Sequence, residues 1–166
     1  MTFSFYAATV PVFSRALTNL SAILAKAEAW AGERKIDPTV LIQARLAPDM
    51  HALPFQIQSS TDRAKFTLMR LTGREGPSWP DDEKSFGELQ ARLRKAQDYL
   101  AAFGPGDLEG AEDRDVTVKI GGKDVVLKGS VYLLERQLPH FWFHVTTAYD
   151  ILRHNGVPLT KGDFVG

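Results

Sequence analysis

The segment LPHFWFHVTTAYDIL, residues 138–152, decides the fold, because its apolar positions recur at steps of three and four. With the preceding turn they form one stripe, which consists of Leu134, Leu138, Phe141, Val145, Ala148 and Leu152. This spacing is typical of an amphipathic helix that packs one face against other helices. Ser130 is the expected N-cap, and Asn155 with Gly156 is the expected end. Pro139 should kink the helix just before His140.

Three upstream segments show the same periodicity. The spacing predicts helices over residues 3–30, 37–71 and 81–103. Pro11 should bend the first helix or delay its start. Pro48 and Pro54 should split or kink the second helix. An equally supported interpretation is that they mark the boundary between a short helix and a longer one. Asp81 or Asp82 is expected to begin the third, since acidic residues favour a helix N-terminus.

The period of the sequence changes between residues 116 and 127, where apolar and polar residues alternate on both sides of Gly121 and Gly122. This pattern predicts a β-hairpin with a two-residue turn, in which Lys119 faces Asp124. Four amphipathic helices with short connections make a four-helix bundle. The sequence therefore predicts a single, mainly α domain over residues 1–166, with a hairpin between the third and fourth helices.

The composition excludes several classes of protein. Lys and Arg number 20 and Asp and Glu number 20, so there is no basic excess to neutralise nucleic-acid phosphates. No apolar run is long enough for a membrane span, and the N-terminus carries no signal-peptide pattern. We therefore expect a cytoplasmic protein. There is no cysteine, which excludes disulfides and restricts any metal site to nitrogen and oxygen ligands.

Histidines flank the apolar stripe of the last helix. His140 and His144 are four residues apart and lie about one turn apart on one helical face, where two imidazoles could hold one metal ion. His51 lies beside a core face of the second predicted helix. Three meeting histidines would leave a coordination position open for water or substrate, as catalytic metal sites do. The alternative is that they are hydrogen-bonded polar residues in a crevice.

Other polar residues are candidates for supporting roles. Gln58 and Asp62 continue the polar stripe of the second predicted helix, so Asp62 is a candidate catalytic base and Gln58 a candidate substrate-polarising group. The alternative for Asp62 is a salt bridge to Lys65 or Arg63. His154 lies at a helix C-terminus, where a capping role is favoured.

Three stretches of the chain resemble a known family: residues 44–50 (ARLAPDM), 143–149 (FHVTTAY) and 152–158 (LRHNGVP). They occur in the order of one histidine, a hairpin insertion and a final H-x-x-x-H. This order is similar to that of the DinB-like (YfiT-like) superfamily of four-helix-bundle proteins. Within it, the chain most resembles an uncharacterised family, domain of unknown function 1993, nearly from end to end.

The resemblance implies a divalent metal, zinc or nickel, held by His51, His140 and His144, and it implies a homodimer. Characterised branches of the superfamily are thiol-dependent S-transferases and a maleylpyruvate isomerase that uses a low-molecular-weight thiol. A small-molecule or thiol substrate is therefore expected, and the thiol would arrive with the substrate because the chain has none. The first hypothesis is a metal-dependent transferase or isomerase. The second is a non-catalytic bundle that dimerises or binds a small ligand without metal.

Overall fold

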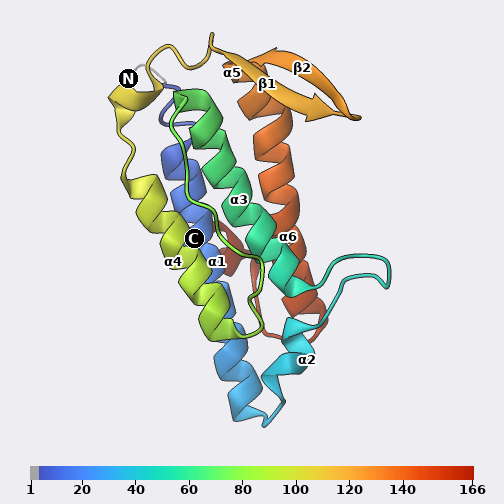
Figure 1. Ribbon diagram of the computed structural model, residues 1–166. Helices are drawn as coiled ribbons and strands as arrows, with labels where there is room; N and C mark the ends of the chain where they lie inside the picture. Colours follow the sequence, from blue (N-terminus) through green and yellow to red (C-terminus); the bar gives the residue numbers. More distant parts are fainter. Residues whose placement is uncertain (1–3) are drawn as a thin grey trace.

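Four long helices stand side by side in the computed structural model, which describes residues 4–166 (Figure 1). They are α1 (Val10–Glu33), α3 (Leu53–Thr72), α4 (Phe86–Ala101) and α6 (Leu138–His154). Helix α3 packs against α4 and α6, and α1 packs against the same two helices from the other side. The predicted mainly α four-helix bundle is therefore confirmed. No helix within residues 4–166 has the length and apolar character needed to cross a membrane.

Shorter elements lie between and around the long helices. They are α2 (Pro38–Ile42), a 3₁₀ turn (Pro105–Leu108), β1 (Asp115–Ile120), β2 (Lys123–Lys128), α5 (Gly129–Val131) and α7 (Lys161–Val165). Strands β1 and β2 form the predicted antiparallel hairpin, with Lys119 opposite Asp124. The hairpin lies over the end of the bundle where α3 ends and α5 begins (Figure 1). Val116 and Val118 are buried, so one face of β1 packs against the bundle through apolar contact.

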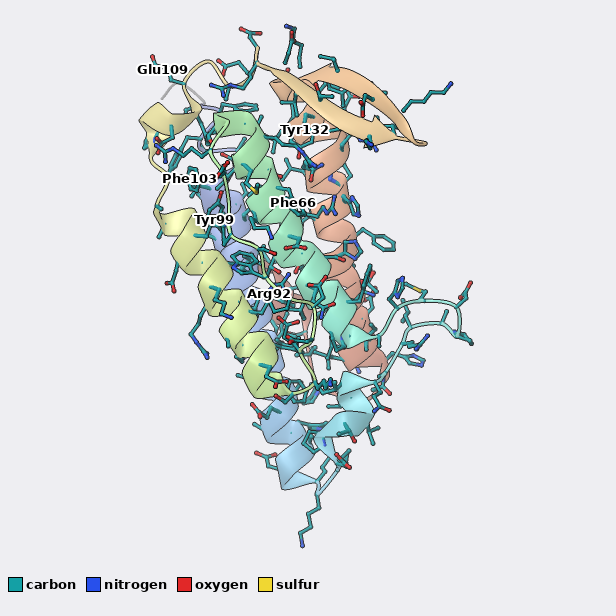
Figure 2. The ribbon with its side chains drawn as sticks, viewed as in Figure 1. Phe66, Arg92, Tyr99, Phe103, Glu109 and Tyr132 are labelled. Carbon is teal, nitrogen blue, oxygen red and sulfur yellow. The ribbon has the colours of Figure 1, made fainter. Side chains whose placement is uncertain are left out.

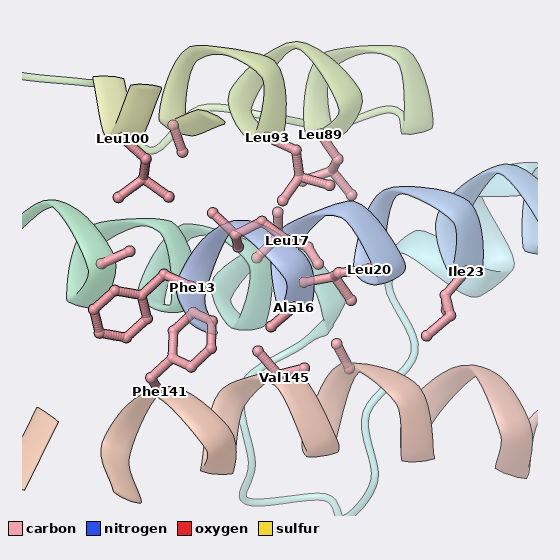
Figure 3. Packing of buried hydrophobic residues seen from close by; sticks show 14 of the residues in the cluster. Phe13, Ala16, Leu17, Leu20, Ile23, Leu89, Leu93, Leu100, Phe141 and Val145 are labelled. Atoms are coloured by element: carbon pink, nitrogen blue, oxygen red, sulfur yellow. The ribbon is translucent and has the colours of Figure 1, made fainter. Parts of the chain in front are cut away.

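The core is formed by the apolar stripes of the long helices. Figure 3 shows Leu17 of α1 between Leu93 of α4 and Val145 of α6. The rings of Phe13 and Phe141 meet edge to face with their centroids 4.8 Å apart. Burial of each large apolar side chain contributes roughly 1.5–3 kcal/mol, so these stripes hold the four helices together.

Proline sets the boundaries of the first two helices. Helix α1 begins at Val10, so Pro11 falls in its first turn, where the missing N–H has no intrahelical partner to lose. The predicted delay is thus confirmed, and residue 3 lies outside the described part of the chain. The second predicted helix is split, because residues 43–52 are not helical. The boundary reading of Pro48 and Pro54 is therefore correct, and His51 lies in a loop rather than on a helix.

Two predicted helix starts are wrong. Helix α4 begins at Phe86 rather than at Asp81 or Asp82. The Ser85 hydroxyl accepts a hydrogen bond from the Glu88 N–H at 3.3 Å, and the Glu88 carboxylate accepts one from the backbone N–H that precedes Ser85, at 2.7 Å. This Ser-x-x-Glu pattern caps a helix, and it decides the start.

The helix that carries the histidine pair, His140 and His144, begins at Gly129 instead of after a Ser130 cap. Its second portion, Tyr132–Gln137, is a π-helical segment, in which Leu138 donates its N–H to the carbonyl five residues back. Pro139 follows closely and has no backbone N–H to donate. The wider turn therefore lies next to the residue that cannot form the helical backbone hydrogen bond.

The π-helical segment shifts the buried face by one residue. Leu133 is fully buried, whereas Leu134 is 54% exposed. The prediction that Leu134 belongs to the apolar stripe is therefore wrong, because a π turn holds more residues than an α turn and moves the upstream register.

Candidate functional site

His144 lies on the inward side of α6 and is 6% exposed. Its Nδ1 is 2.8 Å from Oε1 of Gln56, in the first turn of α3. The amide nitrogen of Gln56 donates to the carbonyl of His51 at 2.9 Å, which fixes the orientation of the amide. Oε1 of Gln56 must then accept, so Nδ1 of His144 carries the proton and donates it. Nε2 keeps its lone pair, which is the form in which histidine binds a metal or accepts a proton.

The surroundings of the histidine pair keep the rings neutral. Burial, as the main cause, and the nearby His140 and Arg63 together lower the pKa of His144 to about 4. Burial is also the main cause that lowers the pKa of His140. Both imidazoles are therefore neutral at pH 7, and a metal ion would not have to displace a proton from them.

The two rings lie at a spacing that fits one shared ion. Their centroids are 5.0 Å apart and their planes are tilted by 33°. Two imidazoles bound to one tetrahedral ion, with metal–nitrogen distances of ~2.0–2.1 Å, have centroids roughly 5 Å apart. The donor set is also suitable, because neutral imidazole nitrogen suits zinc, nickel and copper.

His51 lies near this pair but does not join it. It is exposed on the loop 43–52 and stacks on Phe55, with ring centroids 3.9 Å apart. Phe55 in turn meets the ring of His144 edge to face at 5.8 Å. Within residues 4–166, no three His, Asp or Glu side chains are grouped closely enough to hold a metal ion. The structure thus brings two of the three predicted ligands together and leaves the third on the adjacent loop.

Gln58 and Asp62 lie on a different face of α3. Gln58 donates to a Glu83 carboxylate oxygen at 2.8 Å. Asp62 pairs with Lys65 at 2.9 Å and with Arg92 at 3.0 Å, so the salt-bridge alternative describes its contacts. Arg92 is 1% exposed and is labelled in Figure 2. These contacts fasten α3 to α4 and to the segment before α4. The base role predicted for Asp62 gains no support from them.

Gln56 is the supporting residue that sequence reasoning missed. It lies two residues before Gln58, which places it nearly opposite on the helix. The pattern of the second segment gave no sign of which polar residue would face α6, because that depends on how α3 packs.

His140 also faces a second feature of the structure, a cavity. It lines a cavity of about 770 Å³ between α3, the π-helical segment and the hairpin. The site region therefore consists of the buried His144 and the exposed His140, with a cavity on one side and an exposed loop, carrying His51, on the other.

Comparisons with known proteins give a consistent result. The model of a family described as Domain of unknown function (DUF1993) matches residues 5–165. The structure is similar to the crystal structure of a DinB family member protein from Shewanella denitrificans, with a TM-score of 0.89 and 40% sequence identity. That similarity covers 97% of this chain and 91% of that chain. No curated protein matches the chain.

Proposed function

Because the chain belongs to the DUF1993 family of DinB-like proteins, we propose that it is a metal-dependent enzyme whose divalent ion is held by His140, His144 and His51. The observation that carries the proposal is the environment of the His144 side chain. Its ring is buried, neutral and fixed by Gln56 in the tautomer that leaves Nε2 free. Such hydrogen-bonded orientation of an imidazole is the usual support of a metal ligand.

Each residue of the site has a definable task. Gln56 holds the Nδ1–H of His144 and so fixes the direction of Nε2. His140 supplies a second neutral ring at a centroid distance of 5.0 Å. His51 is carried by the loop 43–52, which would have to move to bring its ring to the pair. Phe55, 38% exposed, lies between these positions and contacts both the His51 ring and the His144 ring.

The chemistry follows from the ligand set. Nitrogen ligands suit zinc or nickel. A bound ion would supply Lewis acidity that lowers the pKa of a thiol or water delivered by a small-molecule substrate. The chain itself contains no cysteine, so the thiol of a transferase or isomerase reaction would have to come from that substrate. Transfer of this reaction class from characterised relatives is an analogy of fold.

One observation favours the second candidate function, a ligand-binding module without metal. His51 is engaged in a stack with Phe55, and its backbone carbonyl, rather than its ring, contacts Gln56. On this reading the histidine pair is a hydrogen-bonded polar group at the edge of the cavity.

Metal analysis separates the two candidates. Protein purified without a histidine tag is stripped with chelator and titrated with Zn²⁺ or Ni²⁺, alongside the variants His144→Ala and His51→Ala. The matched control is His154→Ala, which removes an exposed histidine from the far end of α6. We expect stoichiometric binding in the parent and the control, and loss of affinity by about 10–100-fold or more in both site variants.

Two results would decide against the enzyme. A protein that takes up neither ion, or one whose affinity is unchanged by His144→Ala, has no metal site at the pair. Retained affinity in His51→Ala alone would remove His51 from the ligand set and leave the pair. The expected homodimer stays a prediction, which light scattering on the purified protein can check.

A further inference from the structure

We propose that the cavity beside His140 is a binding site for a small organic acid that carries a hydroxyl or amino group next to its carboxylate. The cavity, here the arginine cavity, is bounded by α3, the π-helical segment and the hairpin. Its volume of about 770 Å³ lies within the range of small-molecule sites. The proposal concerns binding by the protein chain and holds with or without a metal at the histidine pair.

Positive charge dominates the lining of the arginine cavity. Arg63 and Arg70 come from α3, Lys119 from β1 and Arg136 from the π-helical segment, against two acidic residues. Within the described residues, none of these four cations lies within 4.0 Å of a carboxylate. A concave site with unpaired cations concentrates anions, because its walls limit screening by solvent.

Two of the arginines are held in place by aromatic rings. Their guanidinium carbons lie 5.8 Å (Arg63) and 5.4 Å (Arg70) from the ring centroid of Phe66. Arg70 also donates to the Tyr132 hydroxyl at 2.9 Å. Figure 2 labels Phe66 on α3 and Tyr132 across from it. Contacts of this kind orient a guanidinium and leave other N–H groups free to bind a carboxylate in bidentate fashion.

Two residues that line the arginine cavity carry buried polar atoms without partners. Within residues 4–166, Nε of Arg63 and Oε1 of Gln137 are buried and form no hydrogen bond. An unpaired buried donor or acceptor is costly, so each calls for a partner. Burial is the main cause that lowers the pKa of Arg63, the Arg70 charge acts in the same direction, and Tyr132 and Asp62 oppose both.

The two orphan atoms define the ligand. A carboxylate accepts from the Arg63 guanidinium, and a hydroxyl or ammonium group beside it donates to Oε1 of Gln137. Gln137 is 4% exposed because it ends the π-helical segment, which turns it inward. An inorganic anion without a hydroxyl group, such as sulfate, would satisfy the arginine but not the glutamine.

Calorimetric titration of the chelator-treated protein tests the proposal with three probes. L-malate carries a hydroxyl next to a carboxylate, succinate lacks the hydroxyl, and sulfate is an inorganic anion without a hydroxyl. We expect malate to bind best, with succinate and sulfate weaker by about tenfold or more, since a site built for a hydroxyl rejects analogues that lack it.

Variants locate the binding. Arg63→Gln should weaken malate binding by about tenfold or more, and Arg63→Lys should recover only part of it, because lysine lacks the bidentate fork. Gln137→Leu should remove the preference for malate over succinate while it retains binding of both. The matched control is Arg94→Gln, an exposed arginine on α4, which should bind malate as the parent does.

Three outcomes would overturn the proposal. The first is no heat of binding with any probe up to about 10 mM, a limit that corresponds to about 3 kcal/mol of binding free energy. The second is equal affinity for sulfate and malate, and the third is unchanged malate affinity in Arg63→Gln. Circular dichroism of each variant shows whether a loss of affinity comes from a loss of folding. Gln137→Leu tests the site without changing the charge of the cavity. Metal uptake plays no part in these measurements, so failure here leaves the proposed enzyme untouched.

Discussion

Acidification should destabilise the protein through His144. The ring is 6% exposed, and burial first, then the charges of His140 and Arg63, lower its pKa from 6.5 to about 4. Between these two pH values the unfolded chain binds more protons than the folded one, so the free energy of unfolding decreases as the pH is lowered. The contribution of the neutral ring is complete above about pH 6.5, is lost as the pH falls towards 4, and does not change further below that.

The magnitude follows from the two pKa values. Each pKa unit corresponds to about 1.4 kcal/mol. Between about pH 7.5 and pH 4.5 the loss attributable to His144 is therefore about 2.5 kcal/mol, since the ring remains largely neutral in the folded state at the lower pH. Domains of this size have unfolding free energies of only about 5–15 kcal/mol, so the loss is a large fraction of the total.

Urea unfolding of chelator-treated protein at both pH values measures this loss. The comparison variant is His144→Gln, which can still hydrogen-bond Gln56 and does not titrate. On acidification, the free energy of unfolding of the parent should fall by about 2.5 kcal/mol more than that of the variant. If the two proteins lose stability in parallel, to within about 0.5 kcal/mol, the ring is not held in its neutral form and the reasoning about its tautomer fails.

Four further substitutions test the packing and the site. Gly129→Ala would place a Cβ 1.9 Å from the carbonyl oxygen of Ala111, so we expect a loss of about 2–4 kcal/mol in urea unfolding. Gly87→Ala, with open space around it in α4, should instead gain about 0.5–1 kcal/mol, and equal effects of the two would contradict the assigned contact. Arg92→Met leaves three carboxylates without their buried cation and should cost about 3–5 kcal/mol, whereas a neutral result would show that the network is dispensable. Gln56→Leu should reduce metal affinity by about 10–100-fold with the fold retained, and full affinity would remove Gln56 from the site.

The periodic parts of the fold could be predicted from the sequence because local physics dictates them. Apolar steps of three and four identified the long helices, and the change to a period of two identified the hairpin with its Lys119–Asp124 pair. The start of α4 was predictable from Ser85 and Glu88, whose capping pattern outweighs an acidic pair further upstream. The π-helical segment was not, because Leu133 and Leu134 are equally apolar.

The site was less predictable because it depends on how helices face each other. The spacing of His140 and His144 placed both on one side of a helix, and the rings do lie 5.0 Å apart. The selection of Gln58 and Asp62 assumed that His51 lies on the same helix, whereas α3 starts at Leu53, after the loop. Which face of α3 meets α6 is decided by packing across the whole bundle, and that packing selects Gln56.

A single local irregularity links the two proposed sites. Pro139 cannot donate a backbone hydrogen bond, and the π-helical segment directly before it absorbs the disturbance. The wider turn brings Gln137 inward at the edge of the arginine cavity. His144, about two turns further along the helix, faces Gln56. His140 lies between them and contacts both settings. A regular α-helix in this position would keep the histidine pair but rotate the upstream residues, so the proline matters for the cavity rather than for the pair.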